Sequence, residues 1–356
     1  MSSTLGASGK TTAGNFFEDF RLGQVFEHAT PRTVTSGDVA LYQALYGSRF
    51  ALQSSDEFAR GLGLPRAPVD DLLVFHIVFG KTVPDISLNA VANLGYADCR
   101  FMESVYPGDT LATTSEVIGL KENSNHETGV VYVRSTGTNQ HGRPVLIYCR
   151  WVMVRKRDML AAVAAAHVPA LPERVDPAKL AATFPAWSTT AAAWARSGTG
   201  ARFADYKAGE RIDHVDGMTI EEAEHQMATR LYQNTAKVHF NQHTEGQGRF
   251  KRRLVYGGVV ISLARALSFN GLANAGRIVA INGGRHVAPA FAGDTVYAWS
   301  EVVETAPLPS RRDAGLLRLR TFATKNRPCA DFPGRAEKGH ADGVILELDY
   351  WVAVPT

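Results

Sequence analysis

Two apolar runs along the chain have the length and composition of buried helices. These runs are Val69–Phe79 and Val255–Phe269; the second is apolar on nearly every face and stops at Asn270-Gly271, a common helix end. A more polar segment with helical spacing precedes each run, at Ser36–Tyr46 and at Ile220–Tyr232. The pattern therefore predicts the same pair of helices twice, a polar helix followed by a buried one.

After each predicted buried helix, the pattern changes to the alternation that is typical of strands. These segments are rich in β-branched residues and are separated by glycine-containing turns. They are Ala90–Phe101, Thr110–Leu120, Thr128–Thr138 and Val145–Val154, then Ile278–Val287, Thr295–Glu304, Leu316–Thr324 and Gly343–Val354. One buried helix followed by antiparallel strands predicts an α+β fold in which a curved sheet wraps the helix.

The two parts of the chain are copies of one unit. The segment Phe17-Glu-Asp-Phe-Arg-Leu-Gly23-Gln is similar to Phe203-Ala-Asp-Tyr-Lys-Ala-Gly209-Glu, at an offset of 203 − 17 = 186 residues. The same offset carries Leu45-Tyr46 onto Leu231-Tyr232, and a tyrosine present in both copies favours a packing role over chemistry. A repeat of this length indicates two homologous halves.

The repeat sets the predicted boundaries. We expect a flexible tail at residues 1–14, an N-terminal half at 15–157, a linker at 158–200 and a C-terminal half at 201–356. The linker is rich in alanine and proline, so we expect a connection with one or two short helices rather than a third core.

Composition and charge exclude several kinds of partner. The net charge is +3 and most basic residues are scattered, so the sequence indicates no nucleic acid partner. The basic cluster Arg249–Arg253 fits either a solvated surface or a role in holding a phosphorylated ligand. No apolar run reaches transmembrane length, so no membrane association is expected. Three widely spaced cysteines indicate neither a disulfide framework nor a zinc site, which predicts a cytoplasmic protein.

The segment Tyr232–His239 and the helix start that follows it carry residues suited to proton transfer. A histidine such as His239 can act as a base near neutral pH, because its unperturbed pKa is about 6.5. A helix N-terminus offers unpaired N–H groups, and Gly257 and Gly258 would let a carbonyl oxygen approach them closely. This combination predicts a site that moves a proton beside a carbonyl and stabilises the developing oxygen charge.

Comparison of the halves assigns this chemistry to the C-terminal half. At the offset of 186, His239 corresponds to Gln53 and Gly257 corresponds to Asp71. Glutamine cannot act as a base. Asp70 and Asp71 would repel a developing oxyanion, so we expect them to stabilise their own helix N-terminus. The N-terminal half is therefore predicted not to react, and either to shape the pocket or to receive part of the ligand.

The chain resembles the MaoC-like enoyl-CoA hydratases, which have the hot-dog fold. That family places a Gly-Asp-x-Asn-Pro-x-His segment before a Val-His-Gly-Met helix start. Here Gln233-Asn234-Thr-Ala-Lys-Val-His239 and Val255-Tyr256-Gly257-Gly258 stand at those places. Gly-Asp-Thr turns after strands that carry Arg100 and Arg285 add to the resemblance. It covers nearly all of both halves and implies a double hot-dog fold.

Within that family, Ala44-Leu-Tyr-Gly-Ser-Arg-Phe-Ala-Leu52 is most similar to the mesaconyl-CoA (2-methylfumaryl-CoA) hydratases, also called β-methylmalyl-CoA dehydratases. The resemblance implies a hydro-lyase that reversibly hydrates a branched dicarboxylic enoyl-CoA, with coenzyme A as part of the substrate and no further cofactor. It implies catalytic roles for His239, Asn234 and Gly257. The residues expected to bind substrate are Tyr256, Gly258, Lys237 and Arg285, of which Arg285 is either structural or coenzyme-facing.

Asn234 departs from the family pattern, which has aspartate there. An amide can orient water but cannot accept a proton, so His239 is left as the base, and the acid that protonates the α-carbon is not identified. Our hypothesis is that asparagine avoids repulsion with the free carboxylate of mesaconyl-CoA, which Lys237 could pair with. Asn234→Asp should then lose more activity on mesaconyl-CoA than on an uncharged enoyl-CoA. An equal loss on both substrates contradicts the hypothesis.

Two other functions fit the sequence. A hot-dog thioesterase would use Asp70 or Asp71 to activate water, and a non-catalytic acyl-CoA binding protein would use the repeat only to build a pocket. His239 and His243 have the spacing of a metal pair, but no third ligand is evident nearby, so no metal is predicted. The fused halves already supply the pairing that single hot-dog chains obtain by dimerising, so a monomer and a homodimer are both compatible.

Overall fold

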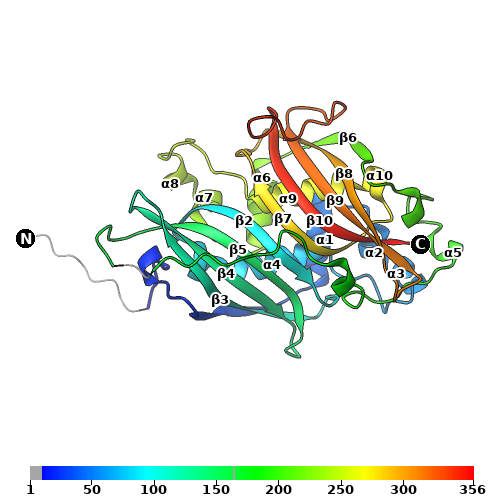
Figure 1. Ribbon diagram of the computed structural model, residues 1–356, viewed down its shortest axis with the longest axis horizontal. Coiled ribbons are helices and arrows are strands. Elements are labelled where there is room, and N and C mark those ends of the chain that lie inside the picture. The colour runs from blue at the N-terminus through cyan, green and yellow to red at the C-terminus, as the bar shows by residue number, and fades with distance from the viewer. Residues whose placement is uncertain (1–9, 163–164) are drawn as a thin grey trace, which may run out of the picture.

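The computed structural model describes residues 10–162 and 165–356, and the two halves share one continuous sheet (Figure 1). The strand order is β1-β3-β4-β5-β2-β7-β10-β9-β8-β6, and all neighbouring pairs are antiparallel. The N-terminal half contributes β1 (Val25–Thr33), β2 (Ala90–Phe101), β3 (Thr110–Glu122), β4 (Thr128–Thr138) and β5 (Pro144–Arg155). The C-terminal half contributes β6 (Arg211–Thr219), β7 (Arg277–His286), β8 (Thr295–Pro307), β9 (Ala314–Lys325) and β10 (Val344–Pro355). The halves therefore join where β2 pairs with β7.

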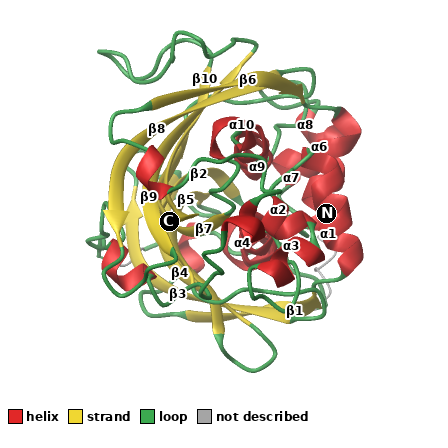
Figure 2. Cartoon of the chain, turned by 90° about the vertical axis from the view of Figure 1, so that its right-hand side faces the viewer, coloured by secondary structure: helices red, strands yellow, loops and turns green. Residues whose placement is uncertain are grey.

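Each half places one long apolar helix inside the curve of the sheet (Figure 2). These helices are α4 (Asp71–Thr82), which is buried along its whole length, and α9 (Gly257–Leu267), which is buried apart from Gly257. The remaining helices are η1 (Phe17–Asp19), α1 (Ser36–Tyr46), α2 (Ala51–Ser54), α3 (Asp56–Gly61), η2 (Val83–Ser87), η3 (Pro177–Leu180), α5 (Ala191–Trp194), η4 (Phe203–Asp205), α6 (Glu222–Leu231), α7 (Lys237–Phe240), α8 (Gln242–Glu245) and α10 (Phe269–Leu272). The α+β double hot-dog architecture predicted from the sequence is confirmed.

The sequence pattern missed strands β1 and β6. Both lie at the outer edges of the sheet, and most of their residues are exposed. An edge strand with a solvated surface lacks the alternation of apolar and polar residues by which strands are recognised. The other eight strands and the four main helices lie within a few residues of their predicted bounds.

Residues related by the repeat meet each other at the centre of the molecule. The hydroxyl oxygens of Tyr46 and Tyr232, 186 positions apart, lie 2.6 Å from each other, and both rings are buried. His76 Nε2 lies 3.0 Å from the Ser262 hydroxyl, at the same separation in sequence. Contacts between equivalent residues indicate that the axis relating the halves passes here. They also fit the packing role expected for the tyrosine pair.

The segment between the halves packs on the outside of the sheet (Figure 1). Trp187 and Trp194 form an apolar cluster with Trp351 of β10, and the Trp351 indole donates to the Val175 carbonyl at 3.1 Å. Of the predicted flexible tail, residues 1–9 lie outside the described residues, and the Ala13 carbonyl accepts a hydrogen bond from the side chain of Asn89 at 2.9 Å. Within the described part of the chain, no helix is long and apolar enough to cross a membrane.

Candidate active site

A cavity of about 320 Å³ lies between the two halves, beside the N-terminus of α9. The N-terminal half lines it with residues of α4, η2, β2 and β5, and the C-terminal half with α7, the start of α9 and β7. The lining residues with polar or reactive groups are Ser87, Asn93, Tyr96, Arg150, Asn234, His239, Tyr256, Gly257 and His286. The volume is in the range of known small-ligand sites.

Four of the seven residues predicted for the site line this cavity: His239, Asn234, Gly257 and Tyr256. The other three lie outside it. Gly258 is buried behind the helix start, where a Cβ atom would lie 2.5 Å from the His76 ring. Lys237 and Arg285 are exposed on α7 and β7, so their predicted contacts with substrate have no support from the cavity geometry.

His239 is held in the orientation of a base. Its Nδ1 lies 2.8 Å from the Leu254 carbonyl oxygen, an acceptor, so Nδ1 carries the proton and Nε2 carries the free lone pair. Burial lowers the pKa of His239 to about 4, so the ring is neutral at physiological pH. The ring centroid lies 5.4 Å from that of Tyr256. His239 therefore presents an unprotonated nitrogen beside the cavity.

Asn234 is fixed by the backbone around it. Its N–H donates to the Thr229 carbonyl at 2.9 Å, and its side-chain oxygen accepts from the Ala236 N–H at 3.2 Å. The preceding residue, Gln233, has a left-handed φ of 54°, which turns the chain after α6. With its oxygen engaged, the buried amide offers its NH₂ group as the donor for a ligand or water.

The N-terminus of α9 is open. The N-cap residue Tyr256 makes no side-chain capping bond, so the first N–H groups of the helix lack the partner that Ser, Thr, Asp or Asn would supply. A Cβ atom at Gly257 would lie 2.3 Å from the His286 ring, so a side chain does not fit there. The geometry suits an anionic oxygen that approaches the backbone directly.

The equivalent end of α4 is closed. Asp70 caps it by accepting from the Leu72 N–H at 2.9 Å, as expected. Asp71 forms a buried ion pair with Arg277 and accepts from the Ile278 N–H at 2.9 Å, which connects α4 to the other half. Neither carboxylate lines the cavity. Unlike the N-terminus of α9, this helix end is capped by a side chain and carries a second carboxylate that would repel an oxyanion.

Comparison with known proteins shows the family. The sequence model of the mesaconyl-CoA hydratase family matches residues 1–337. The chain belongs to this family. It is 63% identical to the β-methylmalyl-CoA dehydratase of Chloroflexus aurantiacus over 351 residues, covering 98% of this chain and 99% of that protein. It is 58% identical to the mesaconyl-CoA hydratase of Cereibacter sphaeroides over 351 residues, covering 97% and 99%.

Solved structures show the same fold. The crystal structure of a MaoC domain protein dehydratase from Chloroflexus aurantiacus matches with a TM-score of 0.94 and 63% identity, covering 98% of this chain and 99% of that one. A double hot-dog protein from Mycobacterium tuberculosis matches with a TM-score of 0.73 and 25% identity, covering 96% and 99%. The mesaconyl-CoA hydratase family assignment and the double hot-dog fold thus support each other.

Sequence reasoning missed five polar residues of the cavity: Ser87, Asn93, Tyr96, Arg150 and His286. His286 Nε2 lies 3.3 Å from the Tyr96 hydroxyl, and burial lowers the pKa of His286 to about 4. The repeat contained a signal for two of them. Its offset is 185 at the Gly-Asp-Thr turns and 200 at Trp151 and Trp351, so that His286 corresponds to Phe101 and Arg150 corresponds to Tyr350. The comparison marks both positions as differing between the halves, but it does not show that they share one cavity with His239.

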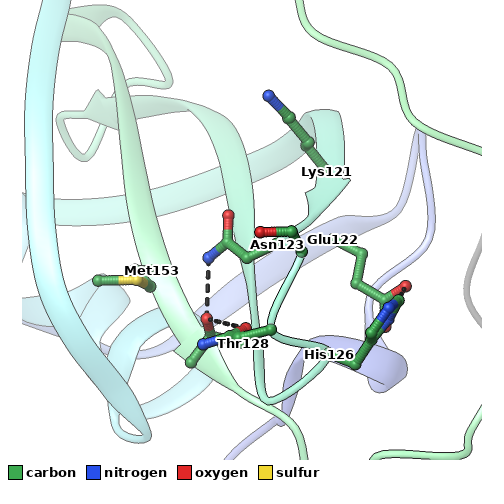
Figure 3. A pocket seen from close by; sticks show the side chains of 8 residues that line it. Lys121, Glu122, Asn123, His126, Thr128 and Met153 are labelled. Carbon is green, nitrogen blue, oxygen red and sulfur yellow. Dashed lines mark hydrogen bonds and ion pairs between the residues drawn. The ribbon is translucent and has the colours of Figure 1, made fainter.

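A larger but shallow hollow of about 580 Å³ lies at the β3–β4 hairpin (Figure 3). It contains an ion pair between His126 and Glu122 at 3.3 Å and a hydrogen bond from Asn123 to Thr128 at 2.8 Å. Met153 lines it, whereas the preceding residue of β5 lines the main cavity, so the two sites lie on opposite faces of the sheet. The His126, Glu122, Asn123 and Thr128 side chains of this hollow already pair with each other, and its described lining residues include no helix N-terminus.

Metal binding finds no support in the described residues, among which no group of three or more His, Cys, Asp or Glu side chains could hold an ion. His243, the second member of the spacing noted in the sequence, is exposed on α8, whereas His239 faces the cavity.

Proposed function

We propose that this chain catalyses the reversible hydration of mesaconyl-CoA to β-methylmalyl-CoA. The observation that carries the proposal is one cavity that brings the free Nε2 of His239 together with the open helix N-terminus at Gly257. The names of the two relatives describe this reaction in its two directions.

In the hydration direction, His239 Nε2 accepts a proton from water as the water oxygen bonds to the β-carbon. The electron pair of the double bond moves towards the thioester, and the Gly257 N–H stabilises the resulting enolate oxygen. The NH₂ group of Asn234 holds the water in line with the β-carbon. The imidazolium of His239 then returns its proton to the α-carbon, which completes the addition of one water. A positioned base of this kind contributes about 10²–10⁴-fold in rate.

The coenzyme A moiety is expected at the C-terminal-half side of the cavity mouth. Phe250 lines the cavity and is partly exposed, and its neighbours Arg249 and Lys251 are exposed. This placement supports the phosphate-binding role considered for the basic cluster, because arginine and lysine pair well with phosphate. Arg253 of the same cluster is instead buried beside Glu222, with which it forms an ion pair.

A thioesterase mechanism is less well supported. It needs a carboxylate that activates water beside the thioester carbon, and no Asp or Glu is among the described residues that line the cavity. Asp70 and Asp71, the residues considered for that role, are engaged by backbone N–H groups and by Arg277.

The test is to incubate the protein with mesaconyl-CoA and record the enoyl-thioester absorbance and the free thiol together. We expect loss of absorbance without release of thiol. Release of thiol would identify a thioesterase, and no change in either signal would identify a binding protein, so both results contradict the proposal.

Compartment and assembly are further parts of this proposal. All three cysteines are free and buried, which supports a reducing, cytoplasmic compartment, and cell fractionation tests this. Sedimentation velocity distinguishes a monomer from a homodimer.

A further inference from the structure

Arg150 of β5 is a fully buried cation with unused donors. Its Nη2 donates to the Thr82 hydroxyl at 2.7 Å and to the Ser87 hydroxyl at 3.3 Å, and its guanidinium lies 4.2 Å from the centre of the Phe79 ring. Its Nε and Nη1 atoms are buried without a hydrogen-bond partner. Within the described part of the chain, no carboxylate forms an ion pair with it. A buried charge of this kind is costly unless a partner arrives.

The cavity around Arg150 is complementary to an anion. No Asp or Glu lines it among the described residues, and its two histidines, His239 and His286, are neutral because burial lowers the pKa of each to about 4. Asn93 also lines the cavity, and both polar atoms of its side chain are buried without a partner. The cavity therefore holds one unneutralised cation and an unsatisfied amide. Both groups are buried in the cavity, so they form an internal anion-binding site rather than a patch on the surface.

Arg150 and the open helix N-terminus face the same cavity from opposite halves. In the sheet, Arg150 pairs in register with Tyr96 of β2, and the Tyr96 hydroxyl lies 3.3 Å from His286. The His286 ring in turn lies directly against Gly257. A small ligand held by both ends of this cavity would carry its anion at Arg150 and its carbonyl oxygen at Gly257.

We propose that Arg150, with Asn93 and Ser87, binds the free carboxylate of the dicarboxylic enoyl-CoA and so selects it over uncharged acyl-CoA thioesters. This inference rests on the proposed function and names its specificity determinant. In mesaconyl-CoA the free carboxylate is bonded directly to the β-carbon. Fixing that carboxylate at Arg150 and the thioester oxygen at Gly257 holds the double bond between them, within reach of a water activated by His239.

This assignment replaces the partner considered from the sequence. Lys237 is exposed and lies outside the cavity, whereas Arg150 is inside it and pre-oriented by Thr82. At the equivalent position of the C-terminal half stands Tyr350, whose hydroxyl oxygen lies 3.0 Å from that of Thr321. Only the N-terminal half therefore carries an arginine at this place in the repeat. The non-reacting half would thus supply recognition, and the other half supplies the base.

Calorimetric titration with two unreactive analogues tests the proposal. Succinyl-CoA carries the free carboxylate, and butyryl-CoA has a methyl group in its place. We expect the wild-type protein to bind succinyl-CoA more tightly, and Arg150→Met to weaken succinyl-CoA binding about 10²-fold while leaving butyryl-CoA binding unchanged. Arg150→Lys, which keeps the charge, should lie between the two. Arg155→Met, an exposed arginine on the same strand, is the matched control and should change neither affinity.

Equal losses for both analogues would show that Arg150 only supports the structure, and no loss for succinyl-CoA would show that it binds no carboxylate. Either result overturns the proposal. If Arg150→Met does not fold, equal affinity of the wild-type protein for the two analogues, or of Arg150→Lys and wild type for succinyl-CoA, overturns it as well. Failure of the proposed function is distinguishable, because it is measured as the absence of hydration by the wild-type protein.

Discussion

At the scale of single residues, the proposed reaction depends on which ring nitrogen of His239 carries the proton. The Leu254 carbonyl fixes the proton on Nδ1, and burial keeps the ring neutral, so Nε2 can accept a proton from water. Asn234 supplies a donor rather than a second base. In the proposed mechanism a single residue, His239, therefore carries the proton-transfer step.

Replacing His239 with glutamine should reduce kcat about 10²–10⁴-fold, because glutamine cannot accept the proton. The fold already accommodates glutamine at the equivalent position of the other half, where Gln53 donates to the Gly276 carbonyl at 2.6 Å, so the variant should fold. Steady-state hydration of mesaconyl-CoA measures the effect. His243→Gln, an exposed neighbour, is the control. Near-normal turnover by His239→Gln would exclude this histidine as the base.

The pH dependence of kcat/KM should reflect the lowered pKa of His239. Since the base works unprotonated and its pKa in the folded free enzyme is about 4, kcat/KM should stay level down to about pH 5 and fall only below it. Unfolding lets buried neutral histidines take up protons, so the free energy of unfolding decreases as the pH falls below about 6.5. Circular dichroism at each pH therefore checks that the protein is still folded. An acid limb with its midpoint near 6.5 in folded protein would contradict the assigned environment.

At the level of elements, the two long helices differ mainly at their N-termini. The N-terminus of α9 is left open by Tyr256 and Gly257, whereas that of α4 is occupied by Asp70 and Asp71. The carboxylates at the start of α4 interact with other groups of the protein, whereas the backbone N–H groups at the start of α9 are available to a substrate. We therefore propose that the same structural element serves stability in one half and chemistry in the other.

Removing the Asp71 carboxylate should destabilise the fold. Asp71→Ala leaves Arg277 buried without its partner, which typically costs about 3–5 kcal/mol in the free energy of unfolding. Urea denaturation followed by fluorescence measures the loss. Glu57→Gln, at an exposed pair in which Arg196 lies 3.9 Å away, serves as the control and should leave stability unchanged. A midpoint shift no larger for Asp71→Ala than for Glu57→Gln would show that this pair does not hold the halves together.

For the molecule as a whole, most of the architecture could be predicted because the same order of helices and strands occurs twice in the sequence. The four main helices and eight strands were found from periodicity, while β1 and β6 were missed because edge strands are largely solvated. His239 and Gly257 were predicted because they lie close together in sequence. Arg150 and His286 were not, since β5 and β7 reach one cavity only through the pairing of β2 with both.

Fusing two copies in one chain allows them to diverge. In a symmetric dimer both helix N-termini and both β5-equivalent strands would carry the same residues. Here one half carries His239 and the open helix N-terminus, and the other carries the buried Arg150 at the same cavity. The central claim is that one asymmetric cavity, with the thioester at α9, carries out the reaction.

A crystal structure of His239→Gln with bound mesaconyl-CoA tests that claim most directly. We predict the thioester oxygen within hydrogen-bonding distance of the Gly257 N–H, with the free carboxylate at Arg150. A thioester bound at the N-terminus of α4, beside Asp71, would contradict the account.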